Sequence, residues 1–123
     1  GTSVGTIERI KKVSEIVKKY VKKKYSVIVV CSAMSGSTNE LIEKSKIISN
    51  NFSDAEYDVL VSSGEQVSCS LIAGRLIHLG LKSRSWTAWQ IPIFTENKHK
   101  FSRINQINKN KLLKYLKQEI QFR

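Results

Sequence analysis

The chain has 123 residues, of which 41% are hydrophobic and 25% charged, the size and composition of one globular domain rather than two. No apolar run approaches the roughly 20 residues that a membrane-spanning helix needs, and no signal peptide is visible, so we expect a cytoplasmic protein without a membrane partner. The formal net charge of +11 lies mostly on residues 11–24 and 98–117, without interleaved aromatic side chains, so we expect no specific nucleic-acid partner.

The first predicted element is an amphipathic helix over residues 4–23, where apolar side chains recur at helical spacing between lysines. Residues 1–5 (GTSVG) ahead of it supply small polar side chains of the kind that cap helices. Residues 27–31 (VIVVC) are a continuous β-branched run, which predicts a strand covered on both faces, as in a parallel sheet. A small-residue loop follows, and Ser37 and Glu40 have the spacing of a capping box that opens a helix to about residue 48.

The middle of the chain predicts two helices separated by a break. Residues 50–54 (NNFSD) indicate a turn, and the S-x-x-E pattern that begins at Ser53 caps a short helix to Val61. Residues 62–65 (SSGE) interrupt that helix. A longer helix then runs up to Gly80, a residue type that often follows a helix C-terminus.

The last third predicts a strand, a loop, a short strand and a helix. Residues 83–93 alternate and indicate a strand, whose end Pro92 places near a sheet edge. Residues 95–103 form a polar loop, and residues 104–107 a short strand. The final helix is capped by one of two asparagines and carries apolar residues on one side. These residues are Asn108 or Asn110 for the cap, and Leu112, Leu113, Leu116 and Ile120 for the apolar side.

The mixture of helices and strands indicates an α/β fold. Two strands make a poor sheet, so we expect that a segment completing the sheet lies outside this chain. Cys31 and Cys69 lack the C-x-x-C or Cys/His spacing of a metal site, and we expect both to be buried free thiols in a reducing compartment.

Three segments resemble the sequence motifs of aspartokinases. Residues 1–5 (GTSVG) are similar to the end of the family's K-F-G-G-T-S-V-G motif, and residues 29–39 (VVCSAMSGSTN) to its V-V-S-A-M-x-x-x-T-[ND] loop. Residues 57–68 (YDVLVSSGEQVS) are similar to its Y-D-x-L-x-S-x-G-E-Q-x-S signature. Residues 85–90 (SWTAWQ) and 102–104 (SRI) follow in the family's order, so the resemblance covers nearly the whole chain.

The resemblance implies the amino-acid kinase (carbamate kinase-like) fold, a three-layer αβα sandwich around a mostly parallel sheet. Residues 1–123 would be its N-terminal, aspartate-binding part, lacking the first strand and the nucleotide lobe and carrying no regulatory ACT domain. The implied reaction is that of aspartate kinase, which converts ATP and L-aspartate to 4-phospho-L-aspartate and ADP. It is the first step of lysine, threonine and methionine biosynthesis.

The resemblance also implies a substrate site. Ser32, Ala33 and Thr38 correspond to positions that hold L-aspartate or lie beside the transferred phosphoryl group, and hydroxyls can bind a carboxylate without adding charge. Glu65 corresponds to the glutamate that pairs with the α-ammonium group of aspartate. The local pattern leaves another interpretation open, in which Ser62 and Glu65 form a plain capping box.

A second group of residues matches the family's phosphate-contacting turn. Gly1, Thr2 and Ser3 would approach the phosphates of ATP at a helix N-terminus, although residues of this type also serve simply as helix caps. Arg103 matches the family's A-R-I position, at a domain or substrate edge. Trp86 and Trp89 are expected to be core and cleft-wall aromatic residues rather than stacking platforms, and His78 to be structural or exposed. Neither His78 nor His99, which lies in a lysine-rich loop, is assigned to catalysis.

The family's catalytic lysine would precede Gly1 by three positions and is not in this sequence, so we assign no catalytic residue and no metal ligand. ATP with magnesium is expected to bind only together with the missing lobe, and the chain alone is expected to be inactive and to hold no cofactor tightly. The alternative is a non-catalytic remnant or split-gene subunit. Because the edge of the predicted strand at 27–31 would be unpaired, self-association or a complementary chain is expected.

Overall fold

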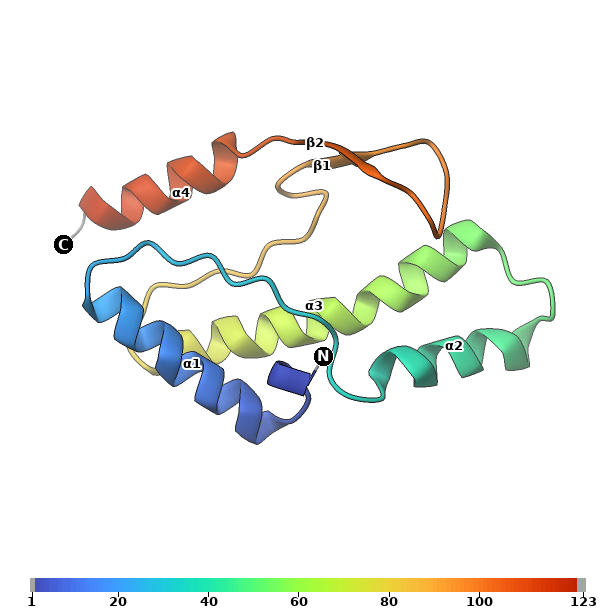
Figure 1. Ribbon diagram of the computed structural model, residues 1–123, viewed down its shortest axis with the longest axis horizontal. Helices are drawn as coiled ribbons and strands as arrows, with labels where there is room; N and C mark the ends of the chain where they lie inside the picture. The colour runs from blue at the N-terminus through green and yellow to red at the C-terminus, as the bar shows by residue number, and fades with distance from the viewer. Residues whose placement is uncertain (1, 122–123) are drawn as a thin grey trace. The chain divides into compact units, whose positions relative to one another are not determined.

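Residues 2–121 are described by the computed structural model, in which the chain forms two units, Gly1–Ser85 and Trp86–Arg123. Among these residues, the first unit contains a short 3-10 helix and the helices α1, α2 and α3, and the second contains strands β1 and β2 and helix α4 (Figure 1). None of the helices within residues 2–121 has both the length and the apolar character that crossing a membrane requires.

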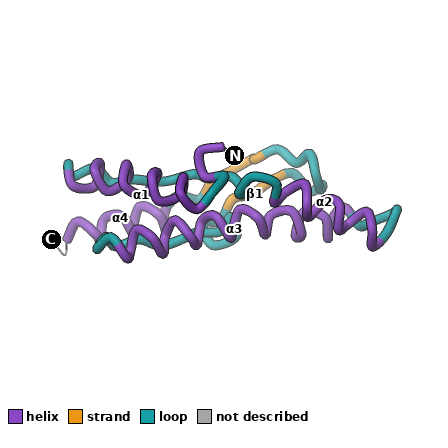
Figure 2. The backbone as a smooth tube through the Cα atoms, turned by 90° about the horizontal axis from the view of Figure 1, so that it is seen from below, coloured by secondary structure: helices purple, strands orange, loops and turns teal. Residues whose placement is uncertain are grey.

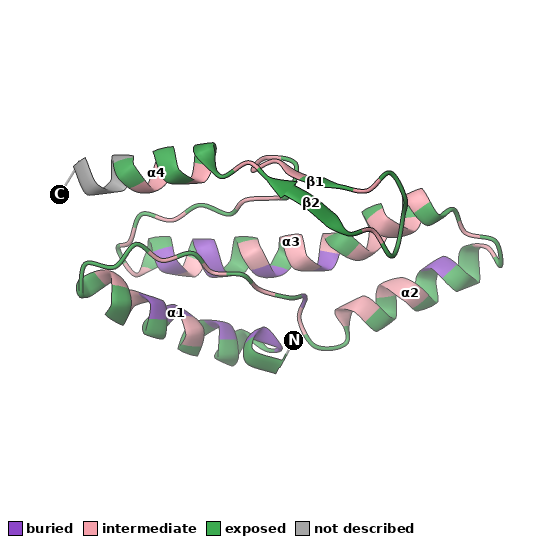
Figure 3. Cartoon of the chain, turned by 45° about the horizontal axis from the view of Figure 1, so that its top comes forward, coloured by how far each residue is buried: buried purple, intermediate pink, exposed green. Residues whose placement is uncertain are grey.

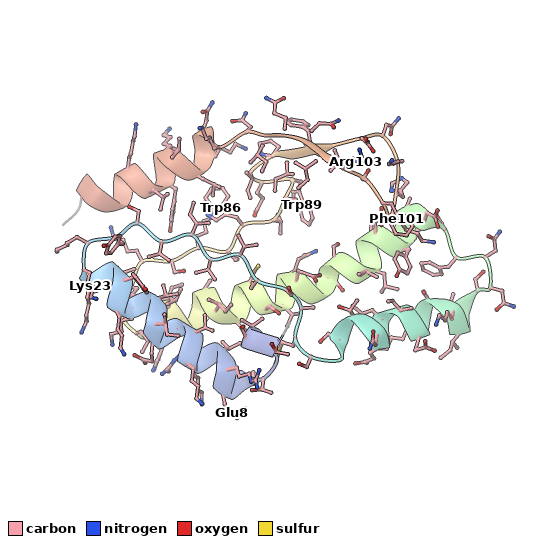
Figure 4. The ribbon with its side chains drawn as sticks, viewed as in Figure 1. Glu8, Lys23, Trp86, Trp89, Phe101 and Arg103 are labelled. Carbon is pink, nitrogen blue, oxygen red and sulfur yellow. The ribbon has the colours of Figure 1, made fainter. Side chains whose placement is uncertain are left out.

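Helix α1 (Ile7–Lys22) confirms the first predicted helix, with a later start. A 3-10 turn, η1 (Thr2–Val4), comes first, and the α1 N-cap is Thr6, whose hydroxyl accepts a hydrogen bond of 3.3 Å from the backbone N–H three residues on. Glu8 in the first turn and Lys23 at the C-cap put charges of the favourable sign at the helix ends (Figure 4). A hydrogen bond to its own backbone N–H lowers the pKa of the Glu8 carboxyl.

Helix α2 (Ser37–Ile48) is also confirmed, but the capping box predicted for it is wrong. Its N-cap is Gly36, with a φ of 81° in the left-handed region that glycine adopts without strain. Ser37 is already inside the helix. The Glu40 carboxylate accepts a hydrogen bond of 2.7 Å from Lys44, so it pairs one turn forward on the exposed surface instead of reaching back to the cap.

Helix α3 (Asp54–His78) is continuous, so the predicted break at residues 62–65 is wrong. The hydroxyls of Ser62 and Ser63 donate to backbone carbonyls three residues back, at 3.0 and 2.6 Å, and therefore do not leave the helix. The predicted cap at Ser53 makes no side-chain capping bond in the structure. The predicted end is confirmed, because Gly80 has a φ of 81° and closes the helix as a C′ residue.

The predicted strand at residues 27–31 is wrong: the chain is extended there, but no strand within residues 2–121 pairs with it. Figure 2 shows this part of the chain as a loop that follows α1. Val27 and Val29 pack against the core, whereas Ile28 and Val30 are 60% and 92% exposed. One face of the segment is therefore covered, not two as predicted.

The core of the first unit lies between α1, α3 and the 3-10 turn. Figure 3 shows buried residues along both α1 and α3. The hydroxyls of Ser14 and Ser68, which are fully buried, each bond to a carbonyl of their own helix. Five buried apolar residues form the main cluster: Val4, Ile10, Val17, Ile72 and Leu76.

The second unit contains an antiparallel hairpin. Strand β1 (Ile93–Thr95) pairs with β2 (Ile104–Ile107), and a register irregularity lies between Phe94 and Thr95. The strand predicted over residues 83–93 is wrong, because residues 88–92 form turns and pairing begins only at Ile93. The polar loop and the short strand that follow it are confirmed.

The last helix, α4 (Asn110–Gln121), follows the hairpin, and the side chain of Asn108 accepts a hydrogen bond of 3.2 Å from the Asn110 backbone N–H. The Trp86 ring meets the Tyr115 ring edge to face, with centroids 5.7 Å apart. Ile120, predicted on the apolar side of this helix, lies outside the side chains that are described.

Candidate functional site

The centre of the candidate site is a hydrogen bond between two of the predicted substrate residues. The backbone N–H of Ala33 donates to Glu65 Oε1 at 3.2 Å, across 32 positions of sequence. Ala33 is buried and Glu65 is half-buried within α3. The carboxylate therefore reaches out to the 32–36 loop, and the plain capping-box interpretation of Ser62 and Glu65 is wrong because both residues lie inside one helix.

Gly64 lets this loop lie directly on α3. A Cβ atom at position 64 would be 2.9 Å from Ala33 Cβ and 3.9 Å from Ser37 Cβ, so any larger residue would push the loop away. The close approach puts the backbone of Ala33 within reach of the next side chain along the helix, Glu65. The S-x-G-E part of the third motif thus combines a contact surface with a carboxylate.

The N-terminal turn joins the same loop. The Ser35 backbone N–H donates to the carbonyl oxygen of Gly5, a buried residue, at 3.2 Å. Thr2 and Ser3 are exposed on η1, and the Thr2 carbonyl accepts a bond from the Arg9 guanidinium. Their interpretation as caps of α1 is wrong, since that cap is a later threonine.

The 32–36 loop is therefore the meeting point of all three motif segments. Two hydrogen bonds and the contact with Gly64 hold it, one bond from the N-terminal turn and one from α3. Gly1, the remaining member of the predicted phosphate turn, lies outside the described residues.

The N-terminus of α2 opens at the end of this loop. Ser37 N–H donates to Met34 O at 3.1 Å, and Glu40 N–H donates to Gly36 O at 3.0 Å. Between them, the N–H groups of Thr38 and Asn39 have no protein acceptor among residues 2–121. Free N–H groups at a helix N-terminus favour an anionic ligand.

The two predicted hydroxyl residues are accessible to a ligand at this place. Ser32 is exposed at the start of the loop, and Thr38 is half-buried in the first turn of α2. The arrangement therefore combines a carboxylate, two hydroxyls and free backbone donors, which suits a small zwitterion with additional negative charge.

The two cysteines lie behind the loop. Cys31 Sγ and Cys69 Sγ are 3.4 Å apart, both thiols are free, and both residues are half-buried rather than buried as predicted. Burial, followed by the contact with Cys69, raises the pKa of Cys31 to about 12. Within residues 2–121 no cluster of His, Cys, Asp and Glu could hold a metal ion.

Arg103 belongs to the second unit and is exposed beside β2 (Figure 4). Its carbonyl accepts a hydrogen bond of 3.0 Å from Glu96 N–H, which closes the hairpin.

Trp86 is half-buried, as predicted for a core aromatic residue, but Trp89 is 64% exposed. His78 is exposed at the end of α3, as expected.

Sequence reasoning missed three features of the site: the Gly5 carbonyl, the packing role of Gly64 and the cysteine pair. The motifs gave no sign of the first, because a backbone carbonyl carries no side-chain signal. A glycine inside a helical pattern was the available signal for the second, since such a glycine indicates close backbone approach as well as a break.

Known proteins share these motifs. The sequence model of the amino acid kinase family matches residues 1–121. The chain is 47% identical over 119 residues to the aspartokinase of Rickettsia felis, a match that covers 94% of this chain and 30% of that protein. It is 46% identical over 116 residues to the aspartokinase of Geobacillus stearothermophilus, covering 94% of this chain and 28% of that protein.

A solved structure is similar too. The crystal structure of aspartate kinase from Synechocystis matches with a TM-score of 0.62 and 44% identity, over 64% of this chain and 14% of that chain. The chain thus spans about 30% of the length of the curated relatives it matches. The resemblance to aspartokinases is confirmed, and so is the fold class, α/β and matching a partial amino-acid kinase fold.

Proposed function

The chain belongs to the amino acid kinase family, and on that premise we propose that it forms the aspartate-binding part of an aspartokinase. The observation that carries the proposal is the Ala33–Glu65 hydrogen bond, which joins the second and third motifs at one place. The whole protein would convert ATP and L-aspartate to 4-phospho-L-aspartate and ADP in the cytoplasm, at the start of lysine, threonine and methionine biosynthesis.

Glu65 is the proposed partner of the substrate α-ammonium group. Its Oε1 atom accepts the Ala33 N–H, which fixes the carboxylate, and its Oε2 atom has no hydrogen-bond donor among residues 2–121. A fixed carboxylate in a half-buried position can form a charge-assisted hydrogen bond with a substrate ammonium group. The contact with Ala33 thus orients the group that selects an amino acid.

The substrate carboxylates are proposed to bind at the α2 N-terminus. The N–H groups of Thr38 and Asn39 and the hydroxyls of Ser32 and Thr38 offer neutral hydrogen-bond donors. Holding the side-chain carboxylate still lets one of its oxygens face the phosphorus that it attacks, and positioning of this kind accounts for much of phosphoryl-transfer catalysis.

ATP with magnesium would supply the phosphoryl group and neutralise its charge. From this chain we propose only a contribution beside the phosphates by Thr2 and Ser3, on the turn η1 that precedes α1, and by Gly1, which comes before them in the sequence. No residue of the chain is proposed as the catalytic group, and the isolated chain is expected to show no kinase activity.

Aspartate binding by the purified chain tests the proposal, measured by isothermal titration calorimetry. Glu65→Gln keeps an acceptor for the Ala33 N–H but removes the charge. We expect it to weaken binding by roughly tenfold or more, since a hydrogen bond to a charged group contributes about 1.5–3 kcal/mol. Glu56→Gln, an exposed change on the same helix, is the matched control and should leave binding unchanged. Equal affinity of the Glu65→Gln variant and the parent would contradict the assignment.

A second candidate function is a non-catalytic subunit that associates through residues 26–33. Within residues 2–121 this segment makes no backbone–backbone hydrogen bond, so its donors and acceptors, apart from the Ala33 N–H that Glu65 accepts, are available to another extended chain. Sedimentation velocity should then show self-association that Val30→Lys abolishes, whereas Ile47→Lys, at an equally exposed apolar position on α2, leaves it intact. A monomer at all concentrations would count against self-association.

A further inference from the structure

The thiol pair of the first unit has no part in the proposed reaction. Cys31 lies at the end of the extended segment and Cys69 lies on α3, with 38 positions of sequence between them. Their sulfur atoms are 3.4 Å apart and unbonded. Two free thiols in direct contact can be joined by a disulfide, so the pair is a candidate modification site.

The pair adjoins the candidate substrate site. Cys31 precedes Ala33 by two residues, and Cys69 follows Glu65 by four residues on the same helix, which puts both α3 side chains on one face. A covalent link between the two sulfur atoms would therefore fasten the beginning of the 32–36 loop to the helix that carries Glu65.

We propose that Cys31 and Cys69 are a reversible disulfide site, which links the 32–36 loop to α3 under oxidising conditions. A disulfide requires the sulfur atoms to approach to about 2.05 Å. The extended segment can provide that movement, because residues 26–33 have no backbone–backbone hydrogen bond among the described residues to hold them in register. Cys69, on a regular helix, stays in place.

The oxidant is a small disulfide such as glutathione disulfide. One protein thiolate attacks a sulfur of that disulfide, forming a mixed disulfide and releasing the first glutathione thiolate. The other protein thiolate then attacks the mixed disulfide, forming the Cys31–Cys69 bond and releasing the second glutathione. The two cysteines lose two electrons and two protons, and the glutathione disulfide gains them as two thiols.

The environment of Cys31 makes the rate of this reaction depend on pH. Burial and the neighbouring Cys69 and Glu65 side chains raise the pKa of Cys31 to about 12, so little of its thiolate exists near neutral pH. Reaction is therefore expected to be slow at neutral pH and faster as the pH rises. Oxidation of an ordinary exposed thiol, with a pKa of about 8.5, would stop accelerating above that pH, whereas this reaction should continue to accelerate.

The test is exposure of the purified chain to glutathione disulfide, with a free-thiol assay and mass spectrometry. We expect loss of both free thiols without retained glutathione, a single peptide pair joining Cys31 and Cys69, and complete reversal by dithiothreitol. Cys31→Ser and Cys69→Ser should each stop at a stable glutathione adduct, and circular dichroism checks that both variants fold. Persistence of both free thiols, a stable adduct on the parent or a disulfide between two chains would overturn the proposal.

The position of the disulfide beside a substrate site rests on the proposed function, whereas the thiol assay does not. If the disulfide forms as described and aspartate never binds, the proposed function fails and the disulfide site stands. If aspartate binds with the Glu65 dependence described above and no disulfide forms, the disulfide site fails alone. Hydrogen exchange of the Ala33 amide is an independent measurement. The Cys31–Cys69 disulfide should slow this exchange relative to the reduced chain, because it fastens the loop in which Ala33 N–H bonds to Glu65.

Discussion

Inside each of the two units, a different kind of contact maintains the structure. In Gly1–Ser85, apolar residues from the 3-10 turn, α1 and α3 meet in one buried cluster, and the 32–36 loop rests on it. In Trp86–Arg123, the hairpin is set by backbone pairing, and every residue of β2 is exposed. Burial therefore positions the substrate motifs, whereas local hydrogen bonds alone shape the hairpin that carries Arg103.

The largest expected difference is in the free energy of unfolding after matched truncations. Ile10, 3% exposed, belongs to the cluster, and Ile10→Ala should cost about 2–5 kcal/mol. Ile104→Ala removes the same atoms from β2, where the residue is 60% exposed, and should stay within about 0.5 kcal/mol. Urea unfolding followed by circular dichroism measures both. Similar losses would remove the distinction between the units.

The next effect concerns the surface on which the loop rests. Gly64→Ala brings a Cβ to 2.9 Å from Ala33 Cβ, and we expect a loss of about 1–3 kcal/mol with the loop displaced. Gly74→Ala on the same helix meets no atom within 4 Å and should stabilise the chain by about 0.5–1 kcal/mol. Thermal unfolding of the two variants should shift in opposite directions, and shifts of the same sign would refute this account of Gly64.

A smaller effect compares one helix cap from each unit. Thr6→Ala removes the side-chain acceptor at the start of α1 and should cost about 1 kcal/mol, since α1 contributes to the buried cluster. Asn108→Ala removes the acceptor beside α4 and should reduce helicity there without moving the main unfolding transition. Nuclear magnetic resonance chemical shifts can follow each helix separately. A main transition that moves equally in both variants would show that the units do not differ.

A further effect, confined to the first unit, is the alkaline dependence of stability from Cys31. Its pKa is about 12 in the folded chain against an ordinary value of 9.0. Above pH 9 the unfolded chain loses this proton and the folded chain keeps it, so the contribution is complete below pH 9 and is lost as the pH rises towards 12. The measured quantity is the difference in the free energy of unfolding between the parent and Cys31→Val, which removes the contributions that the two chains share. An unchanged difference between pH 8 and about pH 11, a range that covers most of this loss, would contradict it.

Helical periodicity predicted most of the fold, because the spacing of apolar residues along a short stretch of sequence is enough to indicate a helix. It gave α1, α2 and α4 within a few residues. It failed at residues 62–65, where two serines and a glycine suggest a break, because the serine hydroxyls bond within the helix and the glycine is covered by Ala33. Tertiary contact outweighed local preference there.

The wrong prediction of a strand at residues 27–31 shows what a local sequence pattern cannot predict. An apolar β-branched run predicts extended backbone, which is present, but a strand also needs a hydrogen-bonded neighbour, which no local pattern can supply. The candidate site divides in the same way. Motif resemblance identified Ala33 and Glu65, whereas the Ser35–Gly5 bond is a contact between backbone groups and leaves no trace in side-chain identity.

The continuity of α3 has a mechanical consequence. Its 25 residues form a single rod of about 37 Å, so Glu65 and the core residues Ile72 and Leu76 are carried by the same rigid body. If α3 tilts against α1, the Glu65 carboxylate moves together with Ile72 and Leu76, because α3 has no break that could bend instead. A broken helix at residues 62–65 would have separated the two. The packing of Ile72 and Leu76 in the core therefore also fixes the angle at which Glu65 faces the 32–36 loop.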